Sequence, residues 1–175
     1  GVTVGLALQG GLANLAGGVL LLLFKPFVVG DYIIQDQSNG CEGTVAKIEI
    51  CYTTLLSIDN KKIVVPNGTL SNSTIINVTA KENRKLEIKV GISYEADIQK
   101  AKRIIEKILR EDPDTKSDTK EMVVFVDELA DSAVIMGLRV WVPTECYWPT
   151  KWRLNQKIKE EFDANGIIIP YNQME

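Results

Sequence analysis

Histidine is absent from this 175-residue chain, and its absence narrows the functions that the sequence can support. Histidine is the side chain best suited to proton transfer near neutral pH, and it is the commonest metal ligand. The sequence also has neither a GxSxG nucleophile motif nor a Gly-Lys-Ser/Thr phosphate-binding loop. We therefore predict a protein that is not an enzyme, with no catalytic residues, no metal site and no cofactor.

Cysteine and net charge are also scarce. The three cysteines, Cys41, Cys51 and Cys146, are odd in number and form no CxxC pair, so neither a disulfide framework nor a zinc site is indicated. We interpret them as reduced cytosolic thiols. The formal net charge of -3 provides no basic field for nucleic acid, which we do not expect as a partner.

Acidic and basic residues are missing altogether from residues 1–24, whereas 20 basic and 23 acidic residues are spread from Lys25 onward. A helix of that length would extend about 36 Å, enough to cross a hydrocarbon core of about 30 Å. A signal peptide would need a basic amino-terminal region and a small-residue cleavage site, and neither is visible. We predict a membrane helix over residues 1–27. Because the chain begins inside the apolar pattern without Met, we expect further segments upstream.

Glycine and alanine make up half of the first eighteen residues. Small residues four apart, such as Gly1 and Gly5, let membrane helices approach closely and pack. A single lipid-facing anchor would use Leu and Val throughout, as residues 19–23 do. The composition therefore predicts several copies of this helix side by side, in a homo-oligomer that encloses an ion-conducting pore.

Val2 and Leu6 share one face of the predicted helix, and Gln9 lies near the end of that face. Rings of these two apolar side chains around a narrow axis would exclude water and form a gate that closes by dewetting. Periodicity fits equally well the alternative that both are ordinary packing residues.

Two glycine steps in the helix, at residues 9–11 and 17–18, are natural places for a bend, because glycine weakens a helix by about 1 kcal/mol relative to alanine. We expect a kink near Gly10. The following segment would then lie near the membrane surface, with Lys25 reaching toward lipid phosphates and Pro26 ending the helix.

From Tyr32 the pattern changes to short β-branched runs separated by turn-forming residues. This pattern predicts a small all-β domain over residues 28–80. Pro66-Asn67-Gly68 predicts a tight turn in which Gly68 is available for positive φ. The expected strands are 32–34, 44–50, 53–58, 62–65 and 74–78.

Residues 81–175 predict a ferredoxin-like α+β domain with the element order β-α-β-β-α-β. Gly166 fits the position just after the second helix. The acidic loop 111–121 lacks EF-hand spacing, which favours a solvated loop over a calcium site. Three tryptophans, at 141, 148 and 152, are interpreted as core and interface residues rather than a base-stacking platform. The expected strands are 85–92, 122–129, 132–142 and 167–169, and the expected helices are 97–110 and 149–164.

Four segments together form a specific combination: GLALQGGLANLAGGVLLLLFKPFVVGDYI at 5–33, GTVAKIEICYTTL at 43–55, IVVPNG at 63–68 and EEFDANGIIIPYNQ at 160–173. This combination resembles the small-conductance mechanosensitive channel (MscS) family over the whole chain. The resemblance implies a homoheptamer in the bacterial inner membrane. Residues from about 28 onward would lie in the cytoplasm as an Sm-like β domain followed by the ferredoxin-like domain.

The resemblance also implies roles for individual residues. Val2 and Leu6 match two hydrophobic constriction rings, Gly10 matches the principal kink, Gly18 matches a second kink, and Phe24 matches a contact with the cytoplasmic domain. Val2 departs from the family pattern, which often has Leu there. Thr3 likewise replaces a small apolar residue.

Two functional hypotheses follow. The first is a channel that opens under membrane tension, in contact with membrane lipids, and releases ions and small osmolytes on hypo-osmotic shock. The second is a membrane-anchored ligand- or RNA-binding module, which rests on fold analogy alone.

Overall fold

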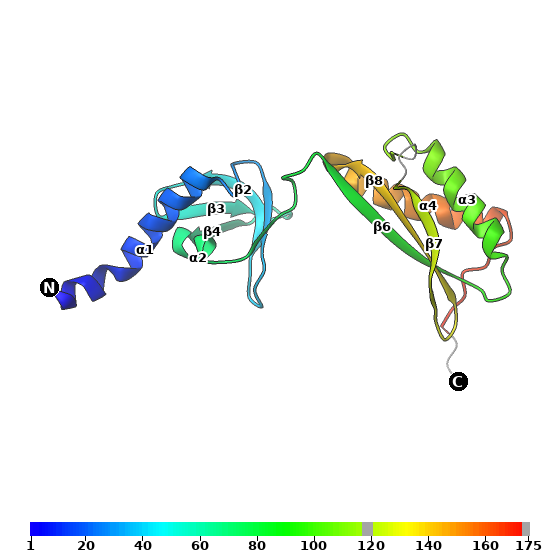
Figure 1. Ribbon diagram of the computed structural model, residues 1–175, viewed down its shortest axis with the longest axis horizontal. Helices are drawn as coiled ribbons and strands as arrows, with labels where there is room; N and C mark the ends of the chain where they lie inside the picture. The colour runs from blue at the N-terminus through cyan, green and yellow to red at the C-terminus, as the bar shows by residue number, and fades with distance from the viewer. Residues whose placement is uncertain (117–120, 173–175) are drawn as a thin grey trace. The chain divides into compact units, whose positions relative to one another are not determined.

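The computed structural model describes residues 1–116 and 121–172, and the chain divides into two compact units, residues 1–81 and 82–175 (Figure 1). Each unit encloses a hydrophobic core of its own. The first unit contains the apolar helix and an all-β domain, and the second is an α+β domain.

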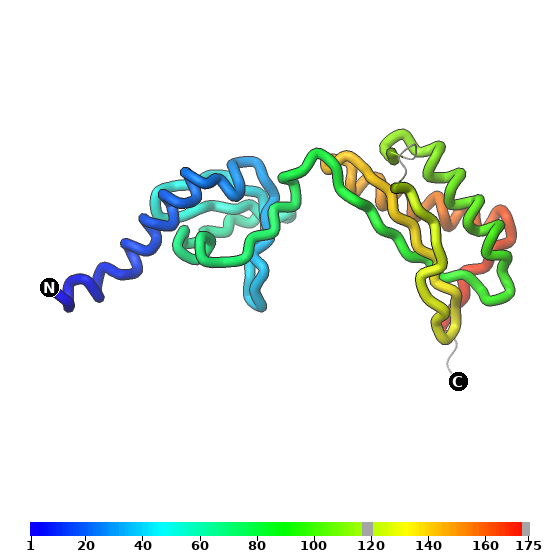
Figure 2. Tube along the Cα trace, in the orientation of Figure 1, coloured from blue at the N-terminus to red at the C-terminus, as the bar shows by residue number. Residues whose placement is uncertain are grey.

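The first unit begins with α1 (Val2–Phe24), a helix of 23 residues that continues through Gly10 without interruption. It ends where Lys25 adopts a left-handed conformation with φ of 48°, its N–H donating to the Leu21 carbonyl at 3.0 Å. Pro26 follows and cannot continue the helix, as expected. Figure 2 shows that the amino-terminal half projects beyond the β domain while the other half lies along it.

The β domain contains the five expected strands in one antiparallel sheet. The strand order is β4-β3-β2-β1-β5, and a register shift between Val45 and Lys47 interrupts the β2–β3 pairing. Leu21 of α1 and Phe27, which follows the helix, enter the core of this sheet. The strands are β1 (Tyr32–Gln35), β2 (Glu42–Ile48), β3 (Tyr52–Leu56), β4 (Lys62–Pro66) and β5 (Ile75–Asn77).

The prediction of a tight turn at Pro66-Asn67-Gly68 is wrong, because these residues open a short helix, α2 (Asn67–Ser71). Gly68 is helical, and the positive-φ glycines of the described residues are Gly30 and Gly166. The helical turn carries Leu70 into the core, where it is 1% exposed. Burial of Leu70 and Asn67 therefore outweighs the local turn preference of the sequence.

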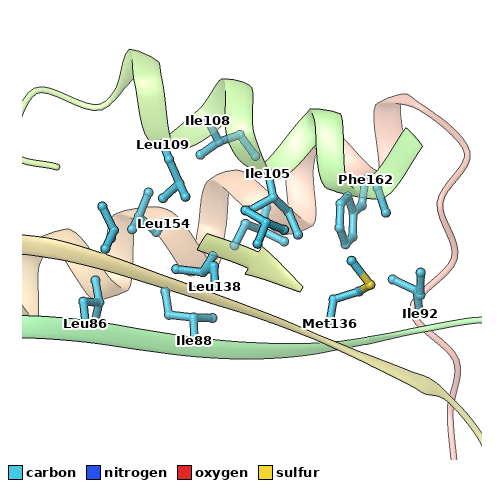
Figure 3. Packing of buried hydrophobic residues seen from close by; sticks show 14 of the residues in the cluster. Leu86, Ile88, Ile92, Ile105, Ile108, Leu109, Met136, Leu138, Leu154 and Phe162 are labelled. Carbon is cyan, nitrogen blue, oxygen red and sulfur yellow. The ribbon is translucent and has the colours of Figure 1, made fainter. Parts of the chain in front are cut away.

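The second unit is a three-stranded antiparallel sheet, in the order β6-β8-β7, with two helices packed on one face. Figure 3 shows that Leu86 of β6 lies at the same end of the core as Leu154 of α4, whereas Met136 of β8 lies below Phe162 of α4 at the other end. The Asp97 carboxylate caps α3 by accepting from the Lys100 N–H at 3.1 Å. The elements are β6 (Asn83–Ile92), α3 (Ile98–Glu111), β7 (Val123–Leu129), β8 (Val134–Pro143), the 3-10 turn η1 (Thr144–Cys146) and α4 (Tyr147–Ala164).

The predicted final strand at 167–169 does not form, although Gly166 ends the preceding helix with φ of 72° as expected. The Ser93 N–H, just after β6, donates to the Ile168 carbonyl at 2.9 Å. Ile167 is buried, whereas Ile168 is 65% exposed. The segment thus lies beside the end of β6, but within its described residues it does not form a strand.

The acidic loop after α3 is held by Arg153 of α4. Its Nε lies 2.6 Å from Asp112 Oδ2, and its Nη2 lies 2.9 Å from both Asp112 Oδ1 and Asp114 Oδ2. Burial alone would raise the pKa of Asp112, but hydrogen bonds from Arg153 and from the Asp114 and Thr115 backbone outweigh burial and lower this pKa. No metal-binding cluster occurs among the described residues, which exclude 117–120 of this loop.

Replacing Arg153 with Met is expected to destabilise the second unit by about 1–2 kcal/mol, because it leaves the Asp112 carboxylate, 5% exposed, without its cation. The folded-state pKa of Asp112 lies below the unfolded value, so the pair stabilises the fold above about pH 4. This stabilisation is lost as the pH falls through the folded pKa. Thermal unfolding of the two proteins at pH 7 and pH 3 should show the difference shrinking in acid.

Lys159→Met is the matched control for Arg153→Met. It removes another α4 ion pair, with Asp163, whose side chains are 59% and 57% exposed. Exposed pairs contribute about 0–1 kcal/mol. An equal loss of stability in both variants would show that the burial of Asp112 is irrelevant.

Candidate functional site: the apolar helix and its seat on the β domain

The helix α1 is the part of the described chain that is long and apolar enough to cross a membrane, judged by length and composition. Its mean hydropathy reaches 1.7, and it contains no charged residue. Most of its large apolar side chains are exposed in this chain, including Val2 at 82% and Leu6 at 67%. Such a surface requires lipid or other protein chains to cover it.

Apart from Gly18, the residues predicted to line and bend the pore lie in the projecting half of α1. Val2, Leu6, Gln9 and Gly10 are exposed. Apart from the neighbouring backbone of the helix itself, a Cβ added at Gly1, Gly5 or Gly10 would meet no atom of this chain within 4 Å. These positions are therefore open to contacts with other molecules, and their roles in constriction, kinking and helix packing stay predictions.

The second half of α1 is held against the β domain at a contact that we call the seat, made by Gly17 and Gly18 of α1 with Ile50, Asn67 and Gly68. A Cβ at Gly17 would lie 2.6 Å from the Asn67 carbonyl oxygen, and one at Gly18 would lie 2.1 Å from the Ile50 carbonyl oxygen. Neither site has room for a side chain. The helix therefore meets the β domain through backbone, and in this structure Gly18 is a packing residue.

Hydrogen bonds reinforce the seat. The Asn67 side chain is buried, with Oδ1 accepting from Thr53 Oγ1 at 2.7 Å and Nδ2 donating to the Glu49 carbonyl at 2.7 Å. The Gly68 N–H donates to Asn14 Oδ1 of α1 at 3.1 Å. The sequence pattern predicts a turn at Asn67 and does not indicate this role. The amide of Asn14 within an apolar run is the one feature of the sequence that points to a polar contact on this face of the helix.

Two apolar side chains anchor the end of α1. Leu21 is 2% exposed and Phe27 is 1% exposed, and both pack in the core of the β domain. Phe24, for which the family resemblance implies this coupling, is 77% exposed in the chain. Helical spacing places Leu21 on the same face as Gly17 and Gly18. This spacing is the sequence feature that could have identified Leu21 as the anchor. The role of Phe24 in an assembly stays a prediction.

Residues 25–31, which we call the elbow, connect α1 to β1 and are fixed by Asp31. Its Oδ2 accepts from the Val28 N–H at 3.0 Å and from Asn77 Nδ2 at 2.9 Å, and its Oδ1 accepts from Thr79 Oγ1 at 3.3 Å. The Val28 bond is the main cause that lowers the pKa of Asp31, and the Asn77 and Thr79 bonds add to it against partial burial. The carboxylate is thus held in its charged form.

A groove of about 730 Å³ lies between α1 and α2. Amide, hydroxyl and apolar groups line it, among them Asn14, Gln37 and Thr69, and none of its lining residues is titratable. The groove therefore lacks the acid and base groups of an active site.

Two family models match the chain. The model described as "Mechanosensitive ion channel, beta-domain" covers residues 11–80, and the model described as "Mechanosensitive ion channel MscS, C-terminal" covers residues 86–169. Together they span the seat, the β domain and nearly all of the second unit.

Curated relatives agree with these models. The chain is 40% identical over 175 residues to the small-conductance mechanosensitive channel of Edwardsiella ictaluri, and 33% identical over 178 residues to that of Helicobacter pylori. These alignments cover 100% of this chain but 60% and 63% of the two relatives. The chain therefore spans about three fifths of the length of such channels.

Solved structures match the fold over its whole length. The crystal structure of Helicobacter pylori MscS, titled as a closed state, superposes with a TM-score of 0.87 at 31% identity, covering 100% of this chain and 68% of that one. Arabidopsis thaliana MSL1 matches with a TM-score of 0.78 at 19% identity, which supports the fold alone, over 98% of this chain and 63% of that one. With an apolar helix, a β domain and an α+β domain in the same order, the chain belongs to the MscS family of mechanosensitive channels.

Proposed function

We propose that this chain forms the pore-lining and cytoplasmic part of a homo-oligomeric channel, a heptamer in the bacterial inner membrane, that opens under membrane tension. Residues from about 28 onward lie in the cytoplasm. Ions and small osmolytes leave through the pore on hypo-osmotic shock. The observation that carries the proposal is an uncharged helix whose projecting half is exposed while its other half is seated on the β domain.

The gate follows from the chemistry of the projecting half. Val2 and Leu6 form apolar rings around the pore axis, which exclude water while the pore is narrow. Gly1 and Gly5 let neighbouring helices approach closely, and Gly10 provides the bend. An open pore occupies more membrane area, so tension favours opening, while the free energy of wetting the rings opposes it. The match to a relative solved in a closed state supports assigning the present arrangement to the closed channel.

Replacing Leu6 with Ser in the full-length channel is expected to lower the tension at which the pore opens. Each leucine contributes about 1.5–3 kcal/mol when its apolar surface is kept from water, and a hydroxyl removes most of that barrier to wetting. Patch-clamp recording from membranes under graded suction measures the midpoint tension. The expected result is a midpoint below that of the unmodified channel.

Leu8→Ser is the matched control, because Leu8 is 56% exposed on the same helix but lies about 200° around it from Leu6. Its effect on the midpoint should be smaller. An unchanged midpoint in Leu6→Ser would remove Leu6 from the gate. Native mass spectrometry supplies the subunit count, and a monomer or dimer without conductance would favour the membrane-anchored binding module instead.

A further inference from the structure

The elbow is tied to the β domain by more than its chain connection. The Gly30 N–H donates to the Val45 carbonyl at 2.8 Å, and the Val45 N–H donates to the Asp31 carbonyl at 2.8 Å. Gly30 adopts a positive φ of 98°, which suits glycine. The main chain of the elbow is therefore paired with β2 before β1 begins.

A side chain from β5, the edge strand next to β1, also reaches the elbow. Asn77 belongs to β5, and its position is set by pairing with Ile33 of β1. Its Nδ2 donates both to the Pro26 carbonyl at 3.1 Å and to Asp31 Oδ2 at 2.9 Å. One amide thus bridges Pro26, two residues after the end of α1, and Asp31, the residue just before β1.

Thr79 completes the arrangement by donating to Asp31 Oδ1 at 3.3 Å and accepting from the Tyr32 N–H at 3.0 Å. We call Asp31, Asn77 and Thr79 the latch. Asn77 and Thr79 are 46 and 48 residues from Asp31 along the chain, so the latch joins the elbow to a segment that is distant in sequence. Hydrogen bonds to a carboxylate are about twice as strong as neutral ones, and the bond from Asn77, at 2.9 Å, is the shorter of the two that the latch makes to Asp31.

Besides the latch, the elbow is held by its main-chain bonds to β2 and by Phe27. Phe27 is buried in the core, but Val28 and Val29 are 46% and 59% exposed. A shift of α1 relative to the β domain must either be absorbed in the elbow or be transmitted through it. The latch binds Pro26 and Asp31 to the same amide, and it therefore opposes a change in the shape of the elbow that would absorb such a shift.

We propose that Asp31 is a positioning residue for gating. Through Asn77 and Thr79 it fixes the segment by which the chain passes from α1 into the β domain. Fixing this segment raises the tension needed to open the pore. The inference rests on the proposed channel function. Weakening the latch gives α1 more freedom to leave its closed arrangement, so the pore opens at lower tension.

The test uses patch-clamp recording from the full-length channel carrying Asp31→Ala, Asn77→Ala or both. Each single variant should lower the midpoint tension, and the double variant should shift it by less than the sum of the two, because they break the same bond. Asp31→Asn keeps one acceptor oxygen and should show a smaller shift than Asp31→Ala. A merely structural role would reduce the number of channels without moving the midpoint of those that assemble.

Asp59→Ala is the matched control. Asp59 is also an aspartate in the β domain whose carboxylate is hydrogen-bonded, but it caps the exposed β3–β4 hairpin through Ser57. Its midpoint should equal that of the unmodified channel.

If Asp31→Ala fails to assemble, Thr79→Ala provides the milder version of the test. Tension-activated conductance with midpoints unchanged or raised in the latch variants would overturn the latch and leave the channel function standing. Absence of conductance in the unmodified protein would instead reject the channel function itself.

Discussion

Gly18→Ala is expected to displace α1 from its seat on the β domain. The added Cβ would lie 2.1 Å from the Ile50 carbonyl oxygen and 2.8 Å from Asn67 Nδ2. The nearer atom is backbone, so relief requires the helix to move. Overpacking of this kind costs about 1–3 kcal/mol or more. We expect less assembled full-length channel by size-exclusion chromatography in detergent, and faster protease cleavage in residues 25–31.

Gly11→Ala is the matched control, because a Cβ there meets nothing within 4 Å in this chain. Alanine also favours a helix over glycine by about 1 kcal/mol. This variant should be neutral or slightly stabilising. Equal behaviour of the two variants would show that the close approach of α1 to Ile50 does not hold the helix.

Phe162→Ala is expected to destabilise the second unit by about 3–5 kcal/mol. Phe162 is fully buried, and it lies among Ile105, Met136 and Ile92 at one end of the core (Figure 3). Both helices and the sheet contribute to this region, so the cavity has few ways to collapse. For a unit of this size we expect the melting temperature to fall by more than about 10 °C.

Tryptophan fluorescence can follow that transition, because the three tryptophans of the chain all lie in the second unit. Tyr171→Ala is the control: it removes an aromatic ring from the same unit at a site 93% exposed. Its melting temperature should match that of the unmodified protein. A small shift for Phe162→Ala would mean that the core repacks around the missing ring.

Much of the fold follows from local patterns in the sequence. The uncharged run of residues 1–24 and the Pro26 that follows it delimit α1. The β-branched runs correspond to the five strands of the β domain, and Asp97 and Gly166 lie at helix ends as their residue types predict. In each case the deciding interaction lies within a few residues, so the sequence period reveals it.

The features that sequence reasoning missed depend on distant partners. Asn67 starts a helix rather than a turn because its side chain is buried against Thr53 and Glu49. The segment after Gly166 has strand-like composition, but its described contact with β6 is a hydrogen bond at Ser93. The sequence around Asp31 does not indicate its role in the latch, because its partner Asn77 lies 46 residues away. Local propensity contains no information about these pairings.

The seat of α1 also bears on how sequences in this family can change. Its closest approaches join glycines of the helix to carbonyl oxygens of Ile50 and Asn67, which every residue type possesses. We therefore expect that exposed side chains around Ile50 can be replaced without altering these carbonyl contacts, as long as the buried Asn67 is kept. On the helix side the contact requires both glycines, the Asn14 amide and the buried Leu21. We therefore expect that a chimera that joins α1 of one relative to the β domain of another keeps this contact, provided that both partners retain the residues of the seat.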